Sequence, residues 1–155
     1  MAKKSSMERV AEAAEAAGLE ITILTMPDST RTAEEAANAC KCEVGQIVKS
    51  LIFQREDTEE FVLLLVAGDR QADLEAAATV VGGPLTRADA KRVRKETGFA
   101  IGGVAPIGHM CPVAVYMDPA LLNHEVVWAA AGAPNAVFSV CPAKLKAAVG
   151  AAVLA

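Results

Sequence analysis

Large aromatic residues and long apolar runs are both scarce in this chain. Only 4% of the 155 residues are aromatic, although 53% are hydrophobic. We therefore expect a core of closely packed small side chains, mainly alanine and valine. No apolar run approaches the ~20 residues of a membrane-spanning helix, and Met1 to Lys4 lead into an amphipathic helix rather than a signal sequence. A cytoplasmic protein without a membrane partner is expected.

Residues with reactive side chains are few as well. The chain has two histidines and four cysteines, and it lacks an H-E-x-x-H motif, a G-x-S-x-G motif and a P-loop. The cysteines lack the C-x-x-C spacing of a zinc ribbon and are expected to be reduced and mostly packed: Cys40, Cys42, Cys111 and Cys141. No metal site and no cofactor are predicted. A redox or metal module built on Cys40-Lys41-Cys42 stays open as an alternative.

The net charge of −4 argues against a general nucleic-acid-binding protein, which is normally basic. Basic residues nevertheless gather in an expected helix over residues 87–97, where one face carries Arg87, Lys91, Arg94 and Lys95. This face could follow a phosphate backbone. An ordinary solvated helix face is the alternative, and the composition favours it.

Hydrophobic periodicity and capping signals predict a single α+β domain over residues 1–155. Helices are expected after the capping pairs Ser5/Glu8 and Thr32/Glu35 and at Pro142. Two further helices are expected over residues 72–80 and 87–97, and strands over 20–25, 46–53, 61–67, 113–117, 125–130 and 136–140. Residues 61–67 are apolar on both faces, which predicts a central strand. Hairpins between strands favour a mixed, mostly antiparallel sheet flanked by helices.

The expected strand over residues 46–53 carries a lysine among apolar side chains. Alternation places Lys49 on one face with Ile47, Leu51 and Phe53, which we take as the core face. A lysine there either extends to the rim of the sheet or is partly desolvated, and either position suggests a function. The alternative is an edge strand whose lysine prevents aggregation.

A second unusual segment is Gly102-Gly103-Val104-Ala105-Pro106-Ile107-Gly108-His109. Three glycines and a proline so close together exclude a helix or a regular strand. Glycines let a ligand approach the backbone and can direct N–H groups at an anion or a developing oxyanion. A plain turn before the next strand is the alternative.

These two segments together resemble the YbaK/ProX family of aminoacyl-tRNA editing domains, which includes the editing insertion of bacterial prolyl-tRNA synthetases and its free-standing relatives. The order and spacing hold from about Thr32 to Leu145, and Ala105 replaces a serine found in many relatives. The segments that carry the resemblance are Thr32–Ala37, Gly45–Phe53, Leu65–Arg70, Gly102–Gly108 and Val126–Gly132.

The resemblance implies a barrel-like YbaK/ProX fold and a trans-acting deacylase that hydrolyses the ester of mischarged tRNA. Catalysis would be substrate-assisted, with the ribose hydroxyl of the tRNA helping to activate water. Lys49 would hold the carbonyl or a nearby phosphate, and N–H groups at Gly102 and Gly103 would support the negative charge. The expected substrate-binding residues are Ser50, Pro106, Gly108, His109, Gly132 and Asn135.

The expected partner is the acceptor end of an aminoacyl-tRNA, docked by Arg87, Lys91 and Lys95, with an aminoacyl-tRNA synthetase as a possible second partner. The competing hypothesis is a protein of the same fold that captures an aminoacyl-tRNA or a synthetase without hydrolysis. The sequence does not indicate which amino acid is removed.

Overall fold

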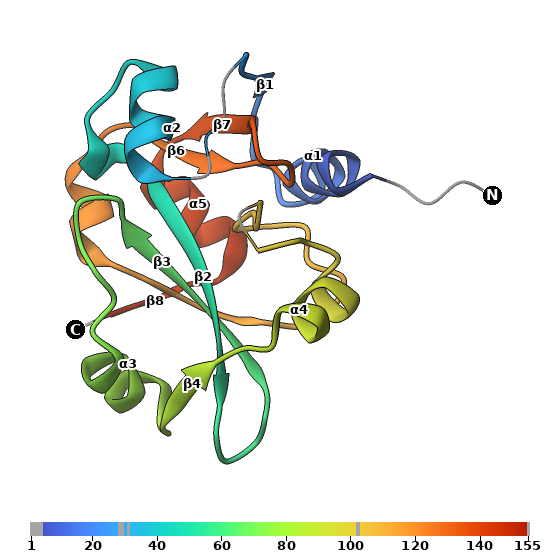
Figure 1. Ribbon diagram of the computed structural model, residues 1–155. Coiled ribbons are helices and arrows are strands. Elements are labelled where there is room, and N and C mark those ends of the chain that lie inside the picture. The colour runs from blue at the N-terminus through green and yellow to red at the C-terminus, as the bar shows by residue number, and fades with distance from the viewer. Residues whose placement is uncertain (1–4, 28–29, 31, 102, 155) are drawn as a thin grey trace.

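The computed structural model describes residues 5–27, 30, 32–101 and 103–154 (Figure 1). Within these ranges, none of the helices combines the length and apolar character that crossing a bilayer requires. The helices are α1 (Ser6–Ala16), α2 (Ala33–Cys40), α3 (Leu74–Val81), α4 (Ala90–Thr97) and α5 (Pro142–Val149), with 3-10 turns η1 (Val44–Gln46) and η2 (Pro119–Asn123). The strands are β1 (Ile23–Thr25), β2 (Val48–Arg55), β3 (Phe61–Ala67), β4 (Leu85–Arg87), β5 (Ala114–Met117), β6 (Val127–Ala130), β7 (Ala136–Val140) and β8 (Ala152–Val153).

The described strands form two sheets rather than a closed barrel. One has the order β4-β2-β3-β5-β8 and the other β1-β7-β6, and an isolated bridge between Ile47 and Trp128 connects them. The β2–β3, β2–β4, β1–β7 and β6–β7 pairs are antiparallel, while β3–β5 and β5–β8 are parallel. The α+β class and the mostly antiparallel pairing are therefore confirmed.

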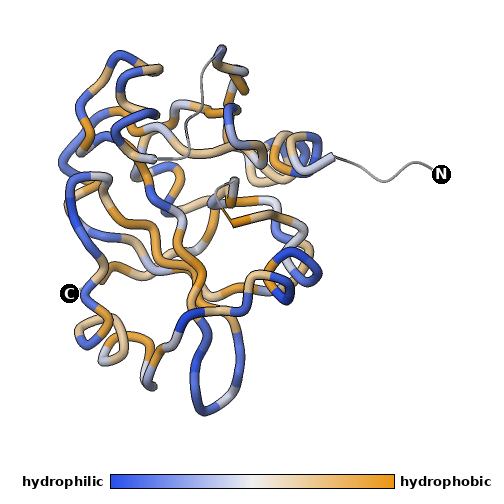
Figure 2. Tube along the Cα trace, in the orientation of Figure 1, coloured by the Kyte–Doolittle hydropathy of each residue, from blue (hydrophilic) through white to orange (hydrophobic). Residues whose placement is uncertain are grey.

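Strand β3 separates two hydrophobic clusters, and every one of its residues is buried. Leu63 and Leu65 belong to the larger cluster, which also contains Phe99 and Phe138. The alternate residues Val62, Leu64 and Val66 pack in a smaller cluster with Ala77 of α3. Figure 2 shows this hydrophobic strand running through the middle of the molecule. The predicted central position of this strand is confirmed.

Local capping chemistry explains where the first two helices begin. The Ser5 side chain accepts the Glu8 N–H at 3.1 Å and starts α1. Thr32 and Glu35 form both hydrogen bonds of a capping box, at 3.0 and 3.1 Å, and start α2. Both predicted helix starts are confirmed, because these signals depend only on residues three apart in the chain.

Several predicted elements begin later than expected, with β1 at Ile23, α3 at Leu74 and β6 at Val127. Two further boundaries bear on the predicted site. The strand predicted from Gln46 begins at Val48, because the Gln46 side chain accepts the Glu43 N–H and closes η1 instead. The helix predicted from Arg87 begins at Ala90, after Asp89 caps it by accepting the Arg92 N–H at 3.0 Å. Arg87 lies in β4, opposite Phe53 of β2, so it does not share a helix face with Lys91 and Lys95.

Candidate functional site

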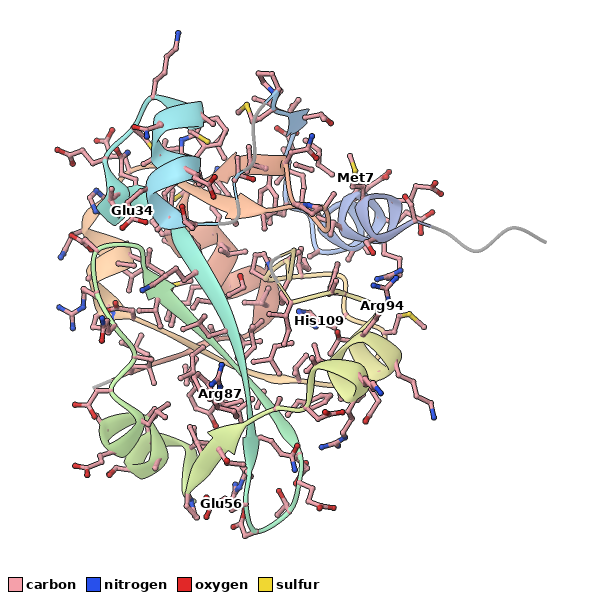
Figure 3. All side chains as sticks on the ribbon, in the orientation of Figure 1. Met7, Glu34, Glu56, Arg87, Arg94 and His109 are labelled. Atoms are coloured by element: carbon pink, nitrogen blue, oxygen red, sulfur yellow. The ribbon has the colours of Figure 1, made fainter. Side chains whose placement is uncertain are left out.

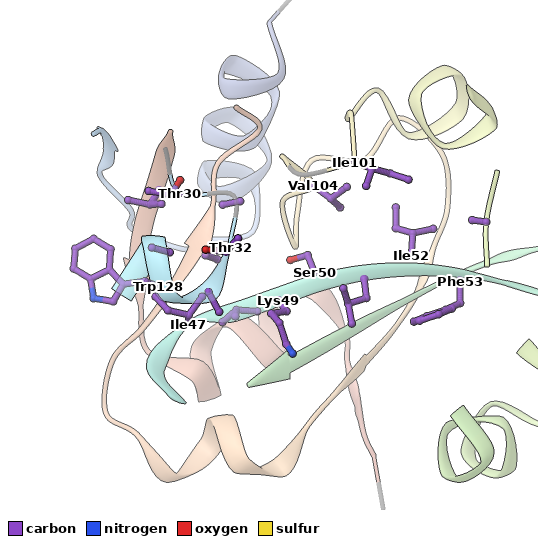
Figure 4. A pocket seen from close by; sticks show the side chains of 18 of the residues that line it. Thr30, Thr32, Ile47, Lys49, Ser50, Ile52, Phe53, Ile101, Val104 and Trp128 are labelled. Atoms are coloured by element: carbon purple, nitrogen blue, oxygen red, sulfur yellow. The ribbon is translucent and has the colours of Figure 1, made fainter. Parts of the chain in front are cut away.

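A cavity of about 450 Å³ opens beside β2 (Figure 4). Its walls come from α2, β2, β4, β6 and β7, together with Thr30, Thr32 and a segment that contributes Ile101 and Val104. Most of these side chains are apolar. The charged side chains that line the cavity are Lys49 and Arg87.

The cavity borders an unpaired stretch of β2. The Gly68 N–H donates to the Ile47 carbonyl and the Arg55 N–H donates to the Glu60 carbonyl. The backbone N–H and C=O groups of the odd-numbered residues of β2 therefore point toward β3. In an antiparallel ladder the backbone groups of the intervening residues then point to the opposite edge. On that edge β4 pairs only with Phe53–Arg55. The N–H and C=O of Ser50 therefore point toward the open edge, where the cavity lies.

Lys49 leaves β2 on the opposite side from Ser50 (Figure 4). It shares its face with Leu51 and Phe53, as predicted, but these residues pack against the smaller cluster under α3. The larger core lies on the other face, with Val48 and Ile52, so the expectation that Lys49 lies on the main core face is wrong. Lys49 is half-buried, and its ammonium donates to the backbone carbonyl of Arg70.

Ser50 presents a buried hydroxyl to the cavity. Its Oγ makes no hydrogen bond with any described part of the protein. A buried hydroxyl without a partner costs about 1–3 kcal/mol, and such groups are uncommon in native structures. Ser50 thus lies in the cavity wall next to Lys49, and its contact with substrate stays a prediction.

The glycine-rich segment contributes to the cavity through Ile101 and Val104. Gly102 lies outside the described residues. Gly103 is not in the cavity wall, and its N–H donates to the Ala100 carbonyl at 3.0 Å. Among the described atoms, a Cβ at Gly103 would meet the Ala133 backbone at 3.5 Å, an ordinary contact distance. Crowding by these atoms therefore does not explain the glycine.

Other glycines in the predicted site hold α1 close to the fold. Gly108 and Gly132 have φ of +91° and +97°, and a Cβ there would lie 3.1 Å from Val10 Cα and 2.8 Å from Ser6 Cβ respectively. Neither residue lines the cavity. Pro106, which is buried, and Asn135, which is half-buried, do not line it either. The Asn135 side-chain amide donates to the Met26 carbonyl at 3.0 Å. The structure therefore gives these four residues positions in the frame around the cavity.

His109 also lies in this frame rather than in the cavity wall. Its Nε2 lies 2.8 Å from the Ala105 carbonyl, and because a carbonyl can only accept, Nε2 carries the proton. The ring meets Phe99 edge-on, with centroids 4.9 Å apart. Burial lowers the pKa of His109, and the nearby Arg9 charge lowers it further. The imidazole is neutral at pH 7, with Nδ1 buried and unpaired among the described atoms.

The predicted docking cations lie on two elements. Arg87 on β4 is exposed and borders the cavity, whereas Lys91 and Lys95 are exposed on α4. Figure 3 shows Arg87 and the α4 residue Arg94 on these separate elements. Arg92, also on α4, stacks over Phe61, with its guanidinium carbon 4.2 Å from the ring centroid.

Comparison with known proteins identifies the family. The family model described as an aminoacyl-tRNA editing domain matches residues 27–148. The chain belongs to this family. A crystal structure of a candidate trans-editing enzyme for prolyl-tRNA synthetase superposes with a TM-score of 0.90 at 47% identity, covering 98% of this chain and 96% of that one.

Curated relatives of this editing domain include free-standing and multidomain proteins. The uncharacterized protein YwhH of Bacillus subtilis (strain 168) is 31% identical over 117 residues, which are 76% of this chain and 74% of YwhH. The proline–tRNA ligase of Thermosipho africanus is 36% identical over 81 residues, which are 52% of this chain but only 14% of that ligase. The resemblance seen in the sequence is confirmed at the level of the family.

Several features of this editing domain were not anticipated from the sequence. Trp128 of β6 lines the cavity and bridges to Ile47. Asp118 caps η2, and its carboxylate is also buried and paired with Arg70 at 3.1 Å. Trp128 is the single tryptophan in the sequence, and this rarity could have marked it as a candidate site residue. No sequence signal marks the Asp118–Arg70 pair, because its partners are 48 residues apart in the numbering.

The cysteines of the editing domain are all free and half-buried. Burial raises the pKa of the Cys40 thiol to about 11, with a smaller contribution from Cys42, and burial also raises the pKa of Cys42 and Cys111. These thiols are therefore protonated at neutral pH. In the ranges that the structure describes, no three His, Cys, Asp or Glu side chains gather in a way that could hold a metal ion.

Proposed function

We propose that this chain is a trans-acting aminoacyl-tRNA deacylase that works as one domain in the cytoplasm. The observation that carries the proposal is the cavity beside β2, which has Lys49, Ser50 and Arg87 in its wall and belongs to an editing-domain chain. Its volume of about 450 Å³ falls in the range of small-molecule sites. An aminoacyl ester with its ribose is a ligand of suitable size.

The proposed chemistry asks little of the protein beyond orientation and charge. An aminoacyl ester is already activated, and the neighbouring ribose hydroxyl can help to activate water. The ammonium of Lys49 would stabilise the negative charge that develops on the carbonyl oxygen. Ser50, through its free hydroxyl and the backbone groups at the open strand edge, would hold the amino or carbonyl group of the substrate. Gly102 and Gly103 remain predicted contributors of N–H groups.

Docking of the tRNA would use the cations outside the cavity. Arg87 at the rim is placed to meet a phosphate close to the ester, while Lys91 and Lys95 on α4 would contact phosphates further along the acceptor stem. The candidate trans-editing relative acts for prolyl-tRNA synthetase by its description. We therefore propose tRNAs charged by that synthetase as the first substrates to test, and the synthetase itself as a possible partner.

A second candidate is capture of the aminoacyl end without hydrolysis. The engaged N–H of Gly103 favours it, because that group already has a partner in the free protein. In that case the cavity would bind an aminoacyl end and leave the ester intact.

A deacylation panel separates these functions. Purified protein is incubated with a set of mischarged tRNAs, including mischarged tRNAPro, and loss of the labelled amino acid is followed over time. Faster loss than in buffer for at least one pair supports the deacylase. Saturable binding of charged tRNA with no acceleration supports capture, and neither binding nor hydrolysis across the panel contradicts both.

A further inference from the structure

The environment of the Lys49 ammonium points to residues outside the cavity. The ammonium donates to the backbone carbonyl of Arg70. Arg70 lies in the turn that follows β3, and its N–H donates to the Ala67 carbonyl at 3.0 Å. Lys49 stands opposite Val66 in the β2–β3 register, so the turn begins one residue beyond its partner. The position of this turn therefore decides where the ammonium can be held.

The turn at residues 67–70 is bound by one buried carboxylate, that of Asp118. Asp118 Oδ2 accepts the Ala67 N–H at 3.2 Å and pairs with Arg70 Nε at 3.1 Å. Its Oδ1 accepts the Ala120 N–H at 3.0 Å, and its own N–H donates to the Leu65 carbonyl at 2.8 Å. The Asp118 side chain is 5% exposed and that of Arg70 is 59% exposed. The same carboxylate thus contacts both ends of the turn, at residue 67 and at residue 70.

We propose that Arg70 and Asp118 are positioning residues for Lys49. The ion pair fixes the turn, the turn fixes the Arg70 carbonyl, and the carbonyl orients the ammonium toward the ester. This inference rests on the proposed function, because it assigns the ion pair to the same reaction. A displacement of a reacting group by about 1 Å can cost up to 100-fold in rate, so a small movement of the turn would affect catalysis.

Arg70→Met is the most direct test, because it removes the guanidinium and keeps both the backbone carbonyl and the length of the side chain. The exposure of Arg70 predicts a folded protein with little change in melting temperature. With a charged acceptor-stem minihelix as substrate, kcat should fall about tenfold while KM changes little. Lys144→Met is the matched control, since it removes one positive charge from an exposed residue on α5.

A double-mutant cycle distinguishes positioning of Lys49 from a general structural role. If Arg70 acts through Lys49, Arg70→Met should cause no further loss of kcat in a Lys49→Ala background. An equal loss in both backgrounds would overturn the proposal. Asp118→Asn should behave like Arg70→Met in the cycle and also lower the melting temperature, because it disturbs a buried carboxylate with three partners.

A chemical measurement tests the contact even without enzymatic activity. Reductive methylation followed by peptide mass spectrometry gives the modification rate of the Lys49 amine, which its hydrogen bond should slow. Arg70→Met should raise that rate at least about twofold relative to Lys144→Met and leave the other lysines unchanged. If no charged tRNA is hydrolysed by the wild-type protein, the proposed function fails while this rate still reports on the contact. An unchanged rate together with an unchanged kcat would refute the positioning role.

Discussion

At the scale of single residues, Lys49 and Ser50 show how adjacent positions on one strand take different roles. The two side chains leave β2 on opposite faces (Figure 4). The Lys49 ammonium donates to a turn carbonyl, whereas the buried Ser50 hydroxyl has no hydrogen-bond partner among the described residues. The cavity reaches both because it lies at the edge of the strand rather than over one face. An edge site can therefore combine a half-buried cation with a buried hydroxyl.

Lys49→Ala should leave the fold intact, because β2 is held by backbone pairing and Lys49 is only half-buried. Deacylation should fall at least about tenfold, equivalent to ~1.4 kcal/mol of transition-state stabilisation. The measurement is kcat/KM on the best substrate of the panel, with circular dichroism to verify folding. Lys144→Ala serves as the control. A folded Lys49→Ala protein with wild-type turnover would remove Lys49 from the mechanism.

The lowered pKa of His109 predicts how the free energy of unfolding depends on pH. Its pKa is lowered in the folded protein from an ordinary value of 6.5, so the unfolded chain binds a proton first as the pH falls. The stabilisation is present above about pH 6.5 and is lost below it, by up to about 1.4 kcal/mol per pH unit for one proton. Urea unfolding should show that His109→Gln loses less free energy of unfolding than the wild type between pH 7.5 and pH 5.5. Glutamine keeps a donor for the Ala105 carbonyl.

His124→Gln is the control for that series, since it removes the other histidine and leaves the glycine-rich segment untouched. The wild type and this control should lose similar free energy of unfolding between the two pH values. If His109→Gln loses as much as they do, protonation of His109 does not contribute to acid destabilisation.

At the scale of elements, local patterns predicted most helices and strands, and long-range contacts explain the errors. Capping pairs and apolar alternation are properties of neighbouring residues, and they gave the starts of α1 and α2 and the central strand. Arg87 was misplaced because its strand exists only through pairing with β2. Likewise, the close packing of α1 against Gly108 and Gly132 depends on the fold and was not evident from the sequence, and their contact with substrate stays a prediction. The position of Trp128 in the cavity wall follows from its bridge to Ile47, a contact between residues far apart in the sequence.

Gly132→Ala tests the role of the glycines in holding α1. The substitution adds a strained left-handed φ, costing about 1–2 kcal/mol, and a contact 2.8 Å from Ser6 Cβ, which should add about 1–3 kcal/mol of overpacking. Gly82→Ala is the matched control, because φ there is +94° and nothing lies within 4 Å of the added Cβ. Urea unfolding should therefore show a larger loss for Gly132→Ala. Equal losses would mean that α1 moves aside without cost.

At the scale of the whole molecule, both the chain and the tRNA proposed as its ligand are acidic. The net charge of −4 disfavours broad contact with tRNA, so binding should be local and should depend on the exposed cations near the cavity. Arg87 borders the cavity, and α4, with Lys91 and Lys95, begins three residues after it. This arrangement suits an acceptor end that enters the cavity and a short stretch of stem that follows α4.

Substitution of Arg87, Lys91 and Lys95 by glutamine should weaken binding of a charged minihelix and leave the chemistry intact. Three phosphate contacts predict a slope of about −2 to −3 for log K against log[salt] in the wild type, and the triple variant should approach zero. At saturating minihelix, kcat should stay within about twofold, because docking cations contribute binding shared by ground and transition states. A Lys41, Lys144 and Lys146 to glutamine variant removes the same charge elsewhere and should retain the wild-type slope. If both triple variants lose affinity equally, net charge and not this surface governs binding; if kcat of the docking variant collapses at saturation, Arg87 acts on the ester itself.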